Sequence, residues 1–413
     1  MHIYKIAYSY LRQKPLYTLL HVMLLGLGLG LILFVLLFFK QLEENFYKNT
    51  KNIDMVIGAE GSPLQLVLSS VYHADVPTGN ISLKEAQKIM QNKLFVKKAI
   101  PLSLGDNFRG FRIVGTTLEY PKNYNAQLQT GNWWNKEMQV VVGSDVAIAE
   151  NLKIGSELVS GHGTQDDDNE ELLHKDEKYV VVGIMKPTKT ILDRLVLTDL
   201  ESIWHIHGEH EEHKNDEKHD HEVHQEHIHE EDKQITALLI KFASPMAVIN
   251  LPRQVDALDN MQSAVPVGEV ARFLSILGIG VEIANILSYI LITIALLSIL
   301  ISIYNALKER KYDLAIMRTL GASKQRLLWM IVFEGFLITF LGMLVGFVLG
   351  HIGLEIVAQV FEKNIHFKLT GFFWVEEEWL LIGVVLIISV ISSLLPALQV
   401  YRIDVIKTLH NLQ

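Results

Sequence analysis

Nine histidines gather between Trp204 and Ile235, a density that no other part of this 413-residue chain approaches. Imidazole nitrogen is a good ligand for Zn²⁺, Ni²⁺ and Cu²⁺, and rings two or three residues apart can reach one ion. The chain has no cysteine, and without thiolates soft Cu⁺ is a poorer match, so zinc is the predicted metal. The predicted ligands are His205, His207, His210, His213, His219, His221, His224, His227 and His229.

Carboxylates alternate with these histidines, and such a composition cannot bury a hydrophobic core. Residues 205–232 are therefore predicted to form a disordered loop between two strands. Two other interpretations stay open. The segment can be a solvated loop that binds metal only opportunistically, or a loop whose imidazoles gain charge below about pH 6.5.

The chain lacks the motifs of an enzyme. It contains no GxxxxGK[ST] phosphate loop, so we do not expect it to hydrolyse ATP by itself. The histidine-rich run has the ligand types of a metallohydrolase, but it lacks a rigid scaffold that would hold an open metal position. Much of the net charge of −9 lies in this run, so the charge does not point to nucleic acid. We predict no enzymatic activity, no intrinsic cofactor and no nucleic-acid partner.

Four apolar runs are long enough to cross a bilayer as helices, which takes about 20 residues. They are 16–39, 276–304, 327–349 and 380–400. The stretch 40–275 is too polar to lie in lipid. The predicted fold is a membrane α-helical protein with four transmembrane helices and a large α+β extracytoplasmic domain inserted between the first and second spans. Three glycines in the first run, Gly26, Gly28 and Gly30, would let another helix approach closely.

Lysine and arginine near the span ends predict the orientation. The N-terminal segment 1–15, the tail 401–413 and the segment 305–326 are all basic, whereas the loop 350–379 is rich in glutamate. The basic residues are Lys5, Arg12, Lys14, Lys308, Arg310, Lys311, Arg318, Lys324, Arg326, Arg402 and Lys407. We predict a multi-pass protein of the bacterial inner membrane, with both termini and 305–326 in the cytoplasm and 40–275 outside.

The external stretch carries signals of both strands and helices. β-branched runs separated by glycine and proline predict strands at 111–115, 139–143, 179–184 and 236–241, and other patterns predict helices at 82–92 and 245–261. The stretch 58–68 reads as a loop entering a helix or strand. An α+β domain of this length can bury its own core without disulfides.

The segment between the second and third apolar runs predicts a charged amphipathic helix. With its flanks it resembles the FtsX/MacB-like permease family of ABC transporters, the macrolide-efflux and lipoprotein-release type. The resemblance rests on Asn305, Glu309, Arg310, Asp313, Leu314, Met317, Arg318, Thr319, Leu320, Gly321, Ala322 and Ser323, with Glu334 further on and the external segments 113–116, 131–133, 141–143 and 152–155. Asp313, Thr319 and Val405 depart from the commoner residues and leave the subfamily and substrate open.

The resemblance implies a cytoplasmic ATPase dimer that docks under the charged helix and, on binding ATP, moves the spans and the external domain together. The implied coupling residues are Asn305, Lys308, Glu309, Arg310, Asp313, Met317, Arg318, Gly321, Ala322 and Ser323. Further implied partners are a second permease copy or paralogue, an external adaptor or metal-binding protein, and membrane lipid. ATP acts only through the partner subunit.

Two functions remain open at this point. One is a transporter permease that exports or mobilises a substrate, and the other is a non-transporting regulator that activates an external partner such as a cell-wall hydrolase or a metal-delivery protein. The external domain exceeds 200 residues and so resembles the larger transporter members of the family more than the compact regulatory members, which favours transport. Within the spans, Glu334 either pairs with a basic residue of the coupling helix or extends to the membrane surface, and Glu282 and His351 are expected near the outer span ends.

Overall fold

The computed structural model describes residues 12, 15–162, 173–206, 233–309, 311–364 and 369–398. The chain forms two compact units. The helical unit takes the chain up to Leu42 and most of it from Ile276 onward, and the sheet unit takes Glu43–Ser275. Each unit is described by itself.

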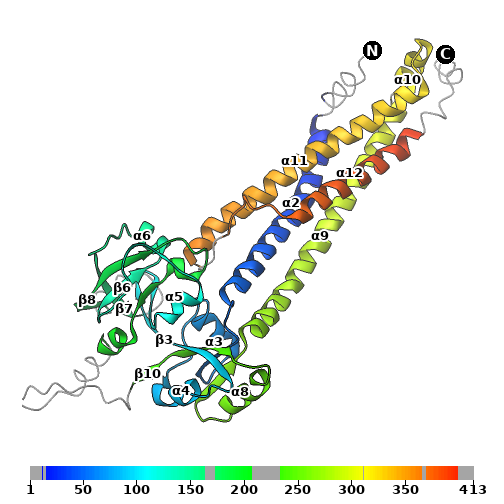
Figure 1. The fold of residues 1–413 in the computed structure, drawn as a ribbon. Helices are drawn as coiled ribbons and strands as arrows, with labels where there is room; N and C mark the ends of the chain where they lie inside the picture. The colour runs from blue at the N-terminus through cyan, green and yellow to red at the C-terminus, as the bar shows by residue number, and fades with distance from the viewer. Residues whose placement is uncertain are drawn as a thin grey trace, which may run out of the picture. The chain divides into compact units, whose positions relative to one another are not determined.

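Long helices dominate the described part of the helical unit (Figure 1). Its helices include α2 (Pro15–Asn49), α9 (Pro266–Glu309), α10 (Lys311–Thr319), α11 (Lys324–Asn364) and α12 (Glu376–Ala397). Among the described residues, α2, α9 and α11 are long and apolar enough to cross a membrane. The fourth predicted run is also helical, as α12, as far as Ala397. The long helices continue past the predicted runs, since α2 ends only at Asn49 and α9 already begins at Pro266.

Glycines allow α2 and α11 to pack closely. A Cβ atom built on Gly26 or Gly30 of α2 would lie 2.7 Å from Val345 Cγ1 or 3.0 Å from Leu349 Cβ of α11. On α11, Gly342, Gly346 and Gly350 face Leu25, Leu29 and Leu33 of α2 in the same way. Small residues at a spacing of four lie on one helix face and bring backbones together. The expectation of close packing at the α2 glycines is confirmed, and Gly28 packs against Leu291 and Ile292 of α9.

The sheet unit contains one large and one small sheet. Among the described residues, the large sheet has ten strands, with nine in the order β12-β1-β11-β3-β4-β9-β6-β8-β5 and β7 paired to β3 and β8, while β10 pairs with β2. The strands are β1 (Met55–Ala59), β2 (Ile81–Ser82), β3 (Val96–Phe108), β4 (Phe111–Thr116), β5 (Leu128–Gly131), β6 (Gln139–Val142), β7 (Glu157–His162), β8 (Leu173–Met185), β9 (Val196–Thr198), β10 (Gln234–Ile235), β11 (Ala237–Phe242) and β12 (Met261–Ala264). The described helices of this unit include α3 (Pro63–Ser70), α4 (Leu83–Met90), α5 (Glu119–Asn123), α6 (Ser144–Ala149) and α8 (Ala247–Val255).

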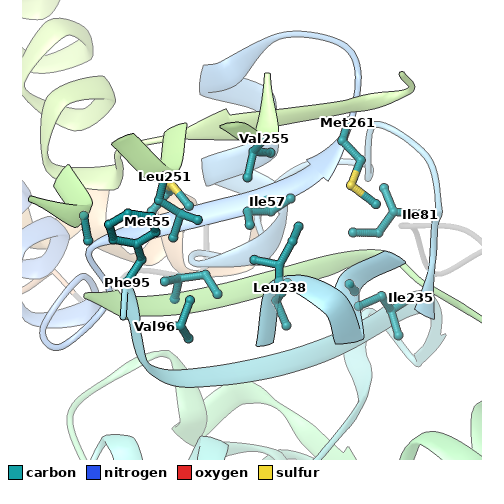
Figure 2. Close-up of a cluster of buried hydrophobic side chains, with 14 of the residues drawn as sticks. Met55, Ile57, Ile81, Phe95, Val96, Ile235, Leu238, Leu251, Val255 and Met261 are labelled. Carbon is teal, nitrogen blue, oxygen red and sulfur yellow. The ribbon is translucent and has the colours of Figure 1, made fainter. Parts of the chain in front are cut away.

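Strand β3 is shared by two hydrophobic cores. Its first half pairs with β11 and its second half with β4, and the register shifts between Leu104 and Asn107. The first core lies where α4 and α8 cover β1, β11 and β12, and Ile57 and Leu238 are paired at its centre (Figure 2). The second core gathers β4, β6, β8 and β9. The four predicted strands and both predicted helices are present, and 58–68 enters helix α3, which Ser62 caps by accepting from Gln65 N.

The ends of two long helices are anchored in the sheet unit. Phe46 of α2 packs edge-on against Tyr72 at 4.8 Å and against Phe273 of α9 at 5.8 Å between ring centroids. Tyr72 Oη donates to Phe46 O at 3.0 Å, and Ile191 N donates to Asn49 Oδ1 at 2.9 Å. The last residues of α2 and the first residues of α9 therefore belong to the sheet unit and pack within it.

Candidate coupling and metal-binding sites

The turn after α10 has the geometry of a helix cap. Ala322 N donates to Met317 O at 2.9 Å and Gly321 N donates to Arg318 O at 3.1 Å. Gly321 has a φ of +96°, which glycine adopts without strain. This is a Schellman motif, and the usual apolar contact accompanies it, because Met317 and Ala322 pack against the same helical core. The Leu-Gly-Ala-Ser sequence thus forms the turn between the end of α10 and the start of α11.

Ser323 begins α11. Its hydroxyl accepts from Arg326 N at 3.3 Å and its carbonyl from Leu327 N at 3.3 Å, as an N-cap residue does. Leu314 and Ala315 of α10 are buried, so this helix has one face in the core and one face open. The hydrogen bonds of this cap and of the Schellman motif hold the turn between α10 and α11 in one conformation.

Nine of the ten predicted coupling residues are described, and all nine are at least partly exposed. Asn305, Lys308, Glu309, Asp313, Gly321 and Ser323 are exposed, and Met317, Arg318 and Ala322 are half-buried. Arg310 lies outside the described residues. Glu334, about two turns past the start of the apolar run at Leu327, is buried within the helical unit.

Leu320 is a candidate that the sequence reasoning left out of the coupling set. It is 80% exposed at the tip of the turn, beside the half-buried Arg318. In the sequence, only its position directly before the capping glycine marks Leu320. An exposed leucine framed by charges is suited to enter an apolar pocket of a partner protein.

Of the nine predicted zinc ligands, only His205 lies within the described residues. It sits on a helical segment, 200–206, that follows β9, rather than in a loop leaving a strand. Its Nε2 atom lies 4.0 Å from Glu177 Oε1. Among the described residues, no group of three or more histidine, aspartate or glutamate side chains has a geometry that could hold a metal ion.

Tyr179, two residues along β8 from Glu177, has acidic surroundings. Burial raises the pKa of Tyr179 above its ordinary range, and the charges of Asp106, Glu177 and Asp199 add to this effect. Tyr179 therefore stays a neutral phenol and does not supply a phenolate ligand. The same negative charges would favour a cation near this part of the sheet unit.

Residues close to both described ends of the gap 207–232 contact one another. Trp204 Nε1 donates to Gln234 O at 2.7 Å, and Lys233 Nζ lies 4.9 Å from the centre of the Trp204 ring. These contacts join the helical segment 200–206 to β10. The described parts of the chain on either side of 207–232 therefore lie close together.

Comparisons with known proteins cover nearly the whole chain. Residues 18–256 match the family described as the MacB-like periplasmic core domain, and residues 285–405 match the FtsX-like permease C-terminal family. No curated protein matches the chain.

Two solved structures are similar to the sheet-rich part. The periplasmic region of MacB from Actinobacillus actinomycetemcomitans aligns at 9% identity with a TM-score of 0.32, over 55% of this chain and 97% of that one. The extracellular domain of the noncanonic ABC-type transporter YknZ from Gram-positive bacteria aligns at 8% identity with a TM-score of 0.30, over 51% of this chain and 98% of that one. By its two family matches, the chain belongs to the FtsX/MacB-like family of ABC transporter permeases.

Proposed function

We propose that this chain is the permease subunit of an ABC transporter in a bacterial inner membrane, working with a separate cytoplasmic ATPase dimer. In this proposal α2, α9, α11 and α12 span the membrane, both termini are cytoplasmic, and the sheet unit lies outside. A second permease copy or paralogue completes the complex. The family membership and the three long apolar helices support the arrangement.

The observation that carries the proposal is the continuity of α9. This helix runs unbroken for 44 residues. Its first turns belong to the sheet unit, where Val270 and Leu274 are buried, and its last residue, Glu309, nearly adjoins α10. Backbone hydrogen bonds along its length make a helix stiff. A displacement of α10 by the ATPase can therefore reach the sheet unit through one element, whatever substrate is moved.

The coupling surface can be tested at Leu320. We expect Leu320→Asp to weaken binding of the ATPase subunit by at least about tenfold, which is about 1.4 kcal/mol, because it places a carboxylate where an apolar contact is proposed. Leu320 is exposed, so the fold should be unaffected. Co-purification of the ATPase with tagged full-length chain, together with ATP turnover of the complex, measures the effect.

Leu94→Asp provides the matched control. Leu94 is 71% exposed in the sheet unit, so the same change there adds the same charge far along the chain from α10. ATPase binding should match that of the unaltered chain. Equal loss in both variants, or normal binding by Leu320→Asp, would contradict the coupling role of the turn.

A link to zinc is the second part of the proposal. The nine histidines, with Glu177 Oε1 at 4.0 Å from His205 Nε2, support it. We expect the full chain to bind zinc in titration calorimetry, and a variant with serine at all the histidines of 207–229 to bind at least about tenfold more weakly. ATPase binding by this variant should be normal. Equal zinc affinity in both chains would remove the histidine-rich segment from the proposal.

A regulator that activates an external partner without moving substrate is the alternative. The anchoring of α2 and α9 in the sheet unit serves it equally well, because motion reaches the external domain in both cases. The apolar character of α2, α9 and α11 favours a permease that acts on material outside the bilayer over one with a polar channel. ATP-dependent release of substrate from vesicles that lack any external partner distinguishes transport from regulation.

A further inference from the structure

A short segment of the helical unit, Thr370–Glu378, is tied to two helices by side-chain hydrogen bonds. Gln41 of α2 brackets Thr370: its Nε2 donates to Thr370 O, and its Oε1 accepts from Thr370 N, both at 2.9 Å. From α11, Glu355 Oε2 accepts from Gly371 N at 2.7 Å. We call this segment the latch, because it joins α2, α11 and the start of α12.

His351 of α11 holds the latch at its centre. Its Nδ1 atom is hydrogen-bonded to Gly371 O, and a carbonyl oxygen only accepts, so Nδ1 carries a hydrogen. The rings of Phe347 and Trp374 lie at 5.8 Å and 5.4 Å from the imidazole, between centroids. A Cβ atom on Gly371 would overlap the His351 carbonyl, so only glycine permits this approach. The orientation of the imidazole is therefore fixed.

The other ring nitrogen faces a buried carboxylate. His351 Nε2 lies 3.4 Å from Glu378 Oε2, and Glu378 is fully buried at 0% exposure. The second carboxylate oxygen of Glu378 accepts from Val375 N at 3.1 Å. Neither Nε2 nor Oε2 has another hydrogen-bond partner among the described residues. Without a proton between them, two acceptors would face each other inside the protein.

We propose that His351 and Glu378 form a buried site that holds one proton and that this proton keeps the latch closed. With one proton the pair is neutral overall, either as imidazolium and carboxylate or as imidazole and carboxylic acid. Loss of the proton leaves a buried carboxylate beside a lone pair. A second proton leaves an imidazolium without its anion. An unpaired carboxylate or an unpaired imidazolium is costly away from water. The latch therefore opens both when the pair loses its proton and when it gains a second one.

The neighbouring charged groups do not replace this proton. On α11, Glu355 is hydrogen-bonded to Gly371 N and to Thr370 Oγ1. On α12, Glu377 is exposed and pairs with Lys40 of α2 at 3.3 Å, and Glu376 is exposed as well. Exposed and paired charges interact weakly with a buried site. The pH response is therefore expected to follow the His351 and Glu378 pair.

The absence of cysteine allows a selective probe of the latch. Phe372 is 84% exposed, so Phe372→Cys can carry a spin label in the full chain, reconstituted in lipid nanodiscs. Label mobility is recorded across a wide pH range, from strongly acidic to strongly alkaline buffer. We expect low mobility at intermediate pH and higher mobility at each extreme, as an acid limb and an alkaline limb.

Two substitutions assign the limbs. In Glu378→Gln the amide can donate to neutral Nε2 and has no proton to lose, so the alkaline limb should disappear. In His351→Gln no second protonation leaves a stranded imidazolium, so the acid limb should disappear. The control Glu377→Gln changes the neighbouring carboxylate of the same helix and should keep both limbs. A flat profile in the otherwise unaltered chain, or a Glu378→Gln or His351→Gln profile that keeps its assigned limb, overturns the proposal.

Discussion

Leucine in place of Gly346 should prevent α2 and α11 from packing and leave most of the full chain aggregated after extraction from the membrane. A Cβ atom at this position would already lie 2.9 Å from Leu29 Cβ, before the rest of the leucine side chain is added. Overpacking of a well-filled interior costs about 1–3 kcal/mol, and more where neither side can yield. Here the neighbour is another helix, and association in lipid depends on such close contact.

The measurement is the folded fraction of the full chain by size-exclusion chromatography in detergent. Gly280→Leu on α9 is the matched control, since a Cβ atom there meets no atom within 4 Å. Both variants remove a helical glycine and add the same apolar side chain, and only Gly346→Leu creates an overlap. Similar folded fractions for the two variants would show that the glycine contact between α2 and α11 contributes nothing.

Alanine in place of Gly131 should be the most damaging single-methyl change in the sheet unit. Gly131 has a φ of +82°, and a Cβ atom would overlap Val182 O and lie 2.8 Å from Gly183 Cα. The positive φ costs about 1–2 kcal/mol of folding free energy for any L-residue. The overlap of the added Cβ atom with β8 forces β5 away from β8, where Gly131 pairs with Gly183. This overlap destabilises the fold by about another 1–3 kcal/mol.

Gly110→Ala separates the two costs. Gly110, in the turn between β3 and β4, has a φ of +80° and no atom within 4 Å of a built Cβ. This control should therefore lose only the backbone part of the stability. Hydrogen exchange of the full chain measures both variants, and β8 amides should exchange faster in Gly131→Ala only. Equal protection in the two variants would mean that the β5 and β8 contact tolerates a methyl group.

For the histidine-rich segment, the sequence predicts the kind of ligand but not whether the ligands meet at one metal ion. Its composition predicts a metal ligand set, and His205 is the single member within the described residues. The zinc assignment is still a prediction. Histidine spacing along a chain reports which rings can reach one ion, but only folded neighbours decide whether three ligands meet.

The turn at residues 320–323, between α10 and α11, was partly predictable from the sequence. The family motif could be recognised from residues 305–323 alone. The reason for its glycine, alanine and serine is local: a positive φ at Gly321, an apolar contact at Ala322 and an N-cap at Ser323. The exposure of Leu320 depends on which face of α10 the helical core covers, so the sequence did not single it out.

By itself, the sequence determined the apolar runs, the α+β character of the insert, its main strands and the charged helix. These features depend on residues near one another in the chain, where length, periodicity and capping act. Only the tertiary structure decided the strand order around β3, the extension of α2 and α9 into the sheet unit, and the meeting of His351 with Glu378. These contacts join residues far apart in sequence, and their stability comes from packing that no local pattern encodes.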